Sequence, residues 1–270
     1  MGGHEARTYW EDWGLLLLFV SFLTGPVAWA LNEMVGYALV YAECYVHPSY
    51  TGRSVGTSLI QLTEARAREL VPLAPPGARV VLDNTINGED GAARRLLEEQ
   101  GYRAARHFRR MAIALEGAPE VQTPDLVSIR PCAPGDDERA IFDALDEALK
   151  DHWEYLPTTF EEWERRIKRY GFDPGLWLVA AEGAEVAGAA VCQDRSGVGW
   201  VSVLGVRRPW RRRGLGLALL RSGFGEFYRR GTRKVALAVD SQSLTGATRL
   251  YERAGMRVAY TGLAFAKEVE

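Results

Sequence analysis

Hydrophobic and polar positions along the second half of the chain alternate between strand-like and helix-like stretches. Leu217, Leu220 and Phe224 recur at three- and four-residue spacing, which predicts a helix, and Gly231 stands where that helix would stop. Apolar runs bounded by turn residues are typical of strands. They span residues 176–182, 185–193, 200–206 and 234–239. The order of these stretches indicates an α/β fold, with helices packed on a mixed sheet.

The turn that follows the run at 200–206 holds arginines and then Gly214 and Gly216. Small residues let the backbone approach a ligand closely, and N–H groups at a helix start form an anion site. A P-loop would continue with Lys and Ser or Thr, but Leu217 and Ala218 follow here, and a dinucleotide fingerprint needs a third glycine. The turn therefore predicts a different pyrophosphate cradle. The alternative is a solvated arginine run before an ordinary helix.

A further helix is predicted after the run at 234–239. Ala247, Leu250, Tyr251 and Ala254 form its apolar face at the spacing i, i+3, i+4, i+7. Ser243 or Thr245 can cap its start, and Gly255 can end it.

The first half of the chain repeats the second. Residues 46–60 match 206–220 at an offset of 160, and residues 93–102 match 247–256 at an offset of 154. A repeat of this length means two copies of one domain, joined by a proline-containing segment. The two domains are predicted to span residues 1–117 and 126–270.

The two copies differ at the positions that carry chemistry. Thr51 replaces Arg211, Ser54 replaces Gly214, and Leu97 stands at the position of Tyr251. The first copy also has fewer residues ahead of its turn than the second. We therefore expect the first domain to be truncated and degenerate, and the second domain to be the catalytic one.

The turn motif Arg211-x-x-Gly214-x-Gly216 resembles the Gln/Arg-x-x-Gly-x-Gly/Ala motif of the GNAT superfamily of acetyl-CoA-dependent N-acetyltransferases. The later helix resembles the family's Asn-x-x-Ala-x-x-Leu-Tyr-x-x-x-Gly-Phe, with Leu244 in place of the Asn. The tandem halves resemble mycothiol synthase and its actinobacterial relatives. Those enzymes place an acid on the strand before the turn, whereas Trp200, Ser202 and Leu204, expected on one face of this strand, include no carboxylate.

The resemblance implies transfer of an acetyl group from acetyl-CoA to a primary amine of a small molecule or peptide. It implies that Tyr251 donates a proton to the leaving thiolate, and that a backbone N–H at Leu204 or Val206 polarises the thioester carbonyl. Asp240, at a strand end near the cleft, is the candidate base, although it is equally a turn residue. Glu182 and Asp194 are further candidates. The expected cofactor-binding residues are Leu204, Gly205, Val206, Arg211, Arg212, Arg213, Gly214, Leu215, Gly216, Leu217 and Ser243.

Composition limits the classes of partner and ligand that the protein is expected to bind. The formal net charge of −2 implies no global attraction to nucleic acid or to an anionic membrane. The three cysteines and four histidines have no metal-ligand spacing, so neither a metal nor a disulfide framework is expected. We expect a cytoplasmic protein, either a monomer with pseudo-dimeric halves or a homodimer.

Three alternatives stay open. The uncharged segment 14–31 could be a signal or membrane segment, although acidic residues precede it, and buried strands or a short core helix are favoured. The tandem fold could bind coenzyme A or a partner without turnover, as a pseudoenzyme. The arginine run could bind nucleic acid, with strong salt dependence.

Overall fold

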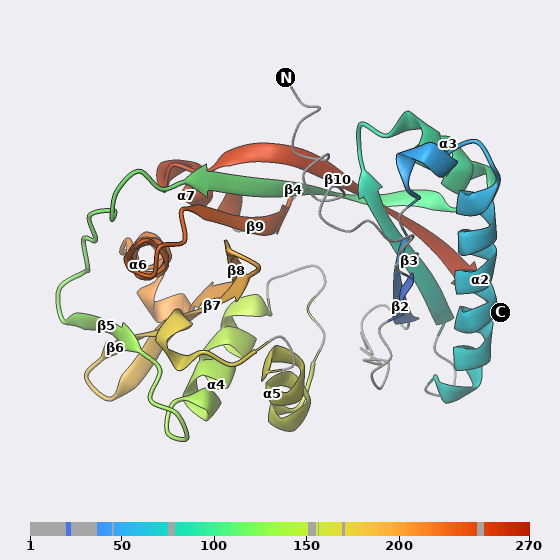
Figure 1. The fold of residues 1–270 in the computed structure, drawn as a ribbon. Helices are drawn as coiled ribbons and strands as arrows, with labels where there is room; N and C mark the ends of the chain where they lie inside the picture. The colour runs from blue at the N-terminus through green and yellow to red at the C-terminus, as the bar shows by residue number, and fades with distance from the viewer. Residues whose placement is uncertain are drawn as a thin grey trace.

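The structure, a computed structural model, describes residues 20–22, 37–44, 46–74, 79–150, 155, 157–168, 171–241 and 246–270. These residues form a mixed α/β fold around one ten-stranded sheet (Figure 1). The strands are β1 (Val20–Phe22), β2 (Tyr37–Cys44), β3 (Arg79–Asn87), β4 (Arg103–Ala114), β5 (Val127–Pro131), β6 (Trp177–Glu182), β7 (Glu185–Arg195), β8 (Val198–Val206), β9 (Lys234–Asp240) and β10 (Arg257–Val269). The α-helices are α2 (Val55–Leu70), α3 (Gly91–Glu99), α4 (Glu138–Leu149), α5 (Phe160–Lys168), α6 (Leu215–Arg229) and α7 (Ala247–Arg253).

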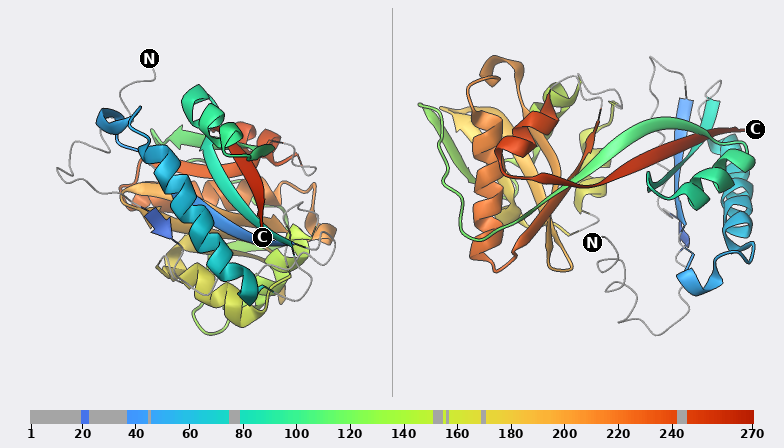
Figure 2. Two further views of the ribbon diagram at one scale, coloured as in Figure 1. Left: turned by 90° about the vertical axis from the view of Figure 1, so that its right-hand side faces the viewer. Right: turned by 90° about the horizontal axis from the view of Figure 1, so that it is seen from above.

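The sheet joins two halves through two long strands. Its order is β1-β2-β3-β10-β4-β9-β8-β7-β6-β5, with β2 parallel to β3 and β8 parallel to β9. Strand β4 belongs to the first half of the sequence, yet it pairs with β9 of the second, while β10 of the second half pairs with β3 of the first. Figure 2 shows these two strands bridging the halves. The halves therefore exchange their last strands reciprocally.

Strand β10 takes part in both halves of the sheet. Its residues from Arg257 to Ala266 pair with β4, and its residues from Gly262 to Val269 also pair with β3. A strand period fixes which faces are buried but not which neighbour a strand finds, so the sequence could not reveal the exchange.

Backbone geometry supports the repeat independently of the residue matches. A short 3₁₀ turn precedes the helix in both halves, and positive φ angles recur at the offset of 160: Gly52 at 72° matches Arg212 at 62°, and Ser54 at 61° matches Gly214 at 85°. Both halves thus make the same left-handed turn into a helix. The degeneracy of the first domain and the exact domain limits stay predictions.

Each face of the sheet buries its own apolar cluster. The largest cluster lies under α6 and includes Phe224 and Phe227, while α4 and α5 cover the opposite face of the second half with Ile141 and Trp163. Helices α2 and α3 cover one face of the first half. Figure 1 shows α6 and α4 on opposite sides of β7 and β8.

A β-bulge in β8 changes the predicted alternation. Val201 pairs with Cys192 and Val203 with Val191, so Ser202 is the extra residue in the strand. A bulge shifts the side-chain alternation by one position. Leu204 therefore packs against the α6 cluster, and the expectation that Trp200, Ser202 and Leu204 share one face is wrong.

The apolar segment 14–31 lies mostly outside the described residues. Its residues 20–22 form β1, which pairs antiparallel with β2. No helix of the described chain is long and apolar enough to cross a membrane.

Candidate active site

The turn into α6 has the geometry of an anion cradle. Gly214 precedes the helix in the left-handed region, at φ 85°, and its carbonyl accepts from the N–H groups of Leu217 and Ala218. The N–H groups at the very start of a helix have no intrahelical acceptor and lie at the positive end of its dipole. Gly216 also lets α7 approach, because an added Cβ would lie 3.3 Å from a Leu250 methyl group. The turn can thus bind a phosphate through its backbone.

Several arginines of the turn hold the protein itself together. Arg211 donates to the carbonyls of Val206, at 3.0 Å, and Ala148, at 3.1 Å. Arg213 binds Glu182 at 3.1 Å, and it is the largest cause that lowers the pKa of that carboxyl below its usual value, with the Trp210 indole second. Arg207 binds Glu147 in the same way, at 2.6 Å. These contacts fix the turn between β8 and α4, and they engage much of the charge on which a nucleic-acid surface would depend.

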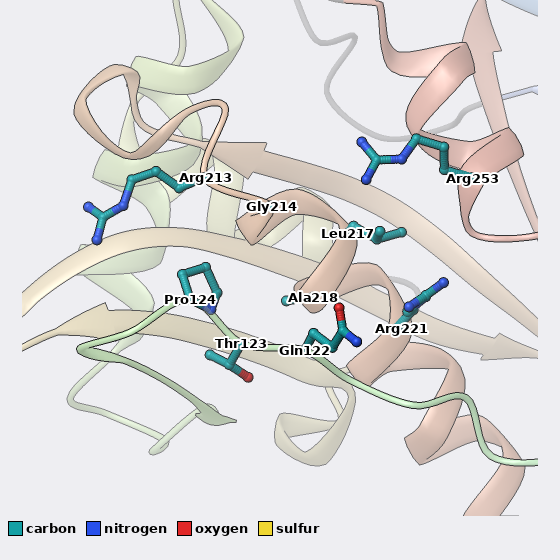
Figure 3. A pocket seen from close by; sticks show the side chains of 9 residues that line it. All are labelled: Gln122, Thr123, Pro124, Arg213, Gly214, Leu217, Ala218, Arg221 and Arg253. Atoms are coloured by element: carbon teal, nitrogen blue, oxygen red, sulfur yellow. The ribbon is translucent and has the colours of Figure 1, made fainter.

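A cationic pocket opens beside the turn (Figure 3). Arg213 and Arg221 come from the turn and α6, Arg253 comes from α7, and residues 122–124 come from the segment that joins the halves. Sequence reasoning missed Arg221, Arg253 and the joining segment. Arg221 stands four residues after Leu217 on the same helix face, which was an available signal. The sequence of the joining segment gave no signal of a binding role, because a proline-containing stretch between two domains indicates only a connection.

Strands β8 and β9 diverge next to this turn. Their parallel pairing covers only Val198 to Trp200 on β8, with Ala236 as the last partner on β9. Beyond this point both strands continue, to Val206 and to Asp240, without pairing to each other. The bulge at Ser202 bends β8 away from its neighbour. An elongated ligand that enters at the α6 turn can therefore bind between the two strands.

The N–H groups of β8 are oriented for such a ligand. Arg207 donates its N–H to Ala187 of β7 at 2.9 Å. Because successive N–H groups of a strand point to opposite edges, those of Leu204 and Val206 point to the β9 side, where no described strand pairs with β8 beyond Trp200. Gly205 lies between them, and it lets α4 pack closely, since an added Cβ would lie 2.8 Å from a Leu145 methyl group.

The corresponding parallel strands in the first half pair over a longer stretch. Strands β2 and β3 pair from Tyr37 to Ala42, so pairing continues two residues beyond Val40, the position that matches Trp200. Pairing in the first half thus extends two residues further than in the second half, although the positions that match Leu204 and Val206 lie beyond it in both halves. This difference favours the second half as the ligand site.

Tyr251 lies on α7, half-buried, and packs against the same cluster as Leu204 and Val206. Burial raises the pKa of its hydroxyl to about 12, so the group stays protonated at neutral pH. Among the described residues that hydroxyl has no hydrogen-bond partner. A protonated hydroxyl beside the opening between β8 and β9 is suited to give a proton to a leaving group.

Asp240, the candidate base, is buried at the end of β9 and forms an ion pair with Arg106 of β4. Arg106 Nε and Nη2 both donate to Asp240 Oδ2, at 3.1 and 2.7 Å. The pair joins the two halves at the strand exchange. The Asp240 side chain lies on the same face of the sheet as the exposed Ala238, which is two residues earlier in β9. The catalytic role of Asp240 stays a prediction, while its structural role follows from this contact.

We expect Asp240→Asn to lower the free energy of unfolding by about 2–3 kcal/mol, because it leaves a largely buried guanidinium without its carboxylate. Denaturant unfolding measures this change. Asp143→Asn is the matched control, since the Arg139–Asp143 pair is well exposed, with 65% and 59% of the two side chains accessible, and should contribute little. Equal small effects of both substitutions would contradict the structural role of Asp240.

The remaining predicted residues are divided between described and undescribed segments. Ser243, one of the expected cofactor-binding residues, lies outside the described residues. Asp194 accepts from Gly197 and Thr232 at the far end of β7, away from the turn. In the described part of the chain, no group of three or more His, Cys, Asp and Glu side chains could hold a metal ion.

A mixed sheet whose parallel strands diverge beside a glycine turn defines the class of acetyl-CoA-dependent acyltransferases, and comparisons with known proteins agree. The model of the acetyltransferase (GNAT) family matches residues 142–256. The mycothiol acetyltransferase of Nocardiopsis dassonvillei is 30% identical, with 89% of this chain and 78% of the relative covered. That of Amycolatopsis mediterranei is 31% identical, with coverage of 85% and 79%. The chain belongs to the GNAT acetyltransferase family.

Solved structures give the same result. A GCN5-related N-acetyltransferase from Sphaerobacter thermophilus is 41% identical, with a TM-score of 0.76, and the match covers 86% of this chain and 74% of that one. A tandem GNAT protein from the clavulanic acid biosynthesis pathway is 14% identical, with a TM-score of 0.64 and coverage of 84% and 75%, and so supports the tandem fold alone.

Proposed function

We propose that the second half of this protein transfers the acetyl group of acetyl-CoA to a primary amine of a small molecule or peptide. The divergence of β8 and β9 beside the turn into α6 carries the proposal. The α6 N–H groups and the arginine pocket bind the phosphates of coenzyme A, and the unpaired edge of β8 binds the pantetheine arm as an added strand would.

Three groups of the protein then act in the reaction. A β8 N–H group at Leu204 or Val206 donates to the thioester oxygen as negative charge develops there, when the amine attacks the carbonyl carbon. As the carbon–sulfur bond breaks, the Tyr251 hydroxyl gives its proton to the thiolate. The attacking nitrogen loses a proton to Asp240 or, through water, to solvent. Holding amine and thioester together supplies the remaining rate enhancement.

The identity of the amine is not carried over from the relatives. The curated relatives are named for mycothiol, but β8 of this chain carries no carboxylate among its residues from Val198 to Val206. A small-molecule amine fits the acetyltransferase assignment. The cytoplasmic location and the monomeric or homodimeric state of the protein stay predictions.

Incubation with acetyl-CoA and a panel of primary amines, read out by release of free thiol and by mass spectrometry of the amine, tests the proposal. We expect thiol and N-acetylated product to appear in equal amounts for at least one class of amine. Tight binding of acetyl-CoA without thiol release for any amine would contradict the proposal and would support the pseudoenzyme alternative.

A further inference from the structure

Beside the opening between β8 and β9, one face of the sheet is partly exposed in the described part of the chain. Val235, Leu237 and Val239 point into the α6 cluster, so Ala236 and Ala238 point to the other face of β9. Ala238 is exposed there, although both neighbouring strands are present. We call this region, formed by Trp200, Ala236, Ala238 and Arg110 of β4, the acceptor face.

Arg110 reaches across the acceptor face. On β4 it pairs with Ala238, two residues beyond the last pairing between β8 and β9. Its guanidinium carbon lies 4.3 Å from the centroid of the Trp200 ring on β8. The side chain therefore crosses above β9, and its charge lies over the point where the two strands begin to diverge. A thioester held along β8 would lie next to it.

The charge of Arg110 is not neutralised by any described carboxylate. Its one described hydrogen bond goes to the Tyr260 hydroxyl, at 3.2 Å. Asp240, the buried acid nearest along this face of β9, binds Arg106 instead. A guanidinium has five N–H donors, so most of the donors of Arg110 remain for a ligand. Its half-buried position over an aromatic ring fixes its orientation at a low cost in entropy.

The ligand that best satisfies this group is a carboxylate. A planar guanidinium binds a carboxylate through two parallel hydrogen bonds, and its charge matches that of one carboxylate. A phosphate monoester carries nearly twice that charge and would require a second cation. The Arg195 guanidinium also lies near the Trp200 ring, 4.7 Å from its centroid, but it comes from the end of β7 that pairs with Val198, away from the opening, and it donates to Gln193. The exposed Cβ of Ala238 leaves space for the carbon atoms that connect such a carboxylate to an amine.

We propose that the acceptor is an amino acid, an amine that carries a carboxylate close to its nitrogen, and that Arg110 binds this carboxylate while the nitrogen faces the thioester. This inference rests on the proposed function, because it assigns the acceptor of the same site. Arg110 is then a specificity-determining residue, which bonds to substrate but takes no part in the movement of protons.

Binding and turnover, measured separately, test the assignment. N-acetylated amino acids and their uncharged carboxamides are titrated by calorimetry into the protein saturated with coenzyme A. The free amino acids, their carboxamides and aminoalkyl phosphonates are then compared as substrates by thiol release. The variants are Arg110→Met and, as matched control, Arg109→Met, because Arg109 is the next residue of β4 and points to the opposite face.

We expect at least one N-acetylated amino acid to bind about 10- to 100-fold more tightly than its carboxamide, which is the usual effect of a hydrogen-bonded charge. This preference should survive Arg109→Met and vanish in Arg110→Met, with a raised KM and a nearly unchanged affinity for acetyl-CoA. Carboxylate-specific binding without thiol release would uphold the role of Arg110 and contradict the acetyltransferase proposal.

Three results would overturn the role of Arg110. The first is equal binding of carboxylates and carboxamides by the unsubstituted protein, which needs no variant to fold. The second is turnover of neutral or phosphonate-bearing amines in preference to amino acids. The third is a carboxylate preference that persists in Arg110→Met.

Discussion

Gly214→Val is expected to remove acetyl-CoA binding. Gly214 has φ 85°, and a side chain in the left-handed region costs about 1–2 kcal/mol, more for a β-branched residue. An added Cβ meets no protein atom within 4 Å, so the valine would project into open space beside the pocket that Gly214 lines. Strain that displaces the α6 N–H groups and a side chain that obstructs phosphate act together. Titration calorimetry should show at least a tenfold loss of affinity, which corresponds to about 1.4 kcal/mol of binding free energy.

Ser54→Val is the matched control for this substitution. Ser54 has the same place in the first half, at φ 61°, so the substitution puts the same side chain at the matching point of the turn, although serine already carries part of the left-handed strain. We expect acetyl-CoA affinity to survive it, because β2 and β3 remain paired beyond the position that corresponds to the opening. Loss of binding in Ser54→Val with binding kept in Gly214→Val would move the cofactor site to the first half.

Tyr251→Phe is expected to lower kcat by about 10²-fold or more, the usual contribution of a positioned proton donor. The substitution keeps the ring that packs against the α6 cluster, so stability and acetyl-CoA affinity should change little. Because burial raises the pKa of Tyr251 to about 12, the unsubstituted enzyme should show no fall in kcat from this group between neutral and moderately alkaline pH. Steady-state kinetics under conditions in which chemistry limits the rate measure both effects.

An unchanged kcat in Tyr251→Phe would show that the hydroxyl is not the donor and that Tyr251 is a core residue. Unfolding of the variant would instead assign its hydroxyl a structural contact. Leu250→Met, at the neighbouring apolar position of α7, is the control for general disturbance of the helix, and it should leave kcat nearly unchanged.

Local features of the site could be predicted from the sequence because they depend on local chemistry. Glycine at position 214 favours the left-handed turn, and the apolar spacing of α6 and α7 needs only a helical period. The repeat could be recognised in the sequence because the same turn and helix recur in order. The structure agrees, since the φ angles at Gly52 and Ser54 match those at Arg212 and Gly214.

Long-range features could not be predicted in the same way. Nothing in the residues of β4 or β10 indicates that each pairs across the halves, since strand partners depend on the whole sheet. The bulge at Ser202 inverts the faces of the residues after it, so the simple alternation failed there. Arg110 and Arg106 reach the site only through the exchange, which brings a first-half strand beside β9.

A crystal structure of the protein with acetyl-CoA bound tests the central claim most directly. We predict one molecule per chain, with its pyrophosphate on the N–H groups at the start of α6 and its pantetheine arm between β8 and β9. The thioester sulfur should lie near the Tyr251 hydroxyl. Acetyl-CoA bound instead at the first-half turn around Gly52 and Ser54, or with its pantetheine arm outside the opening between β8 and β9, would contradict the account.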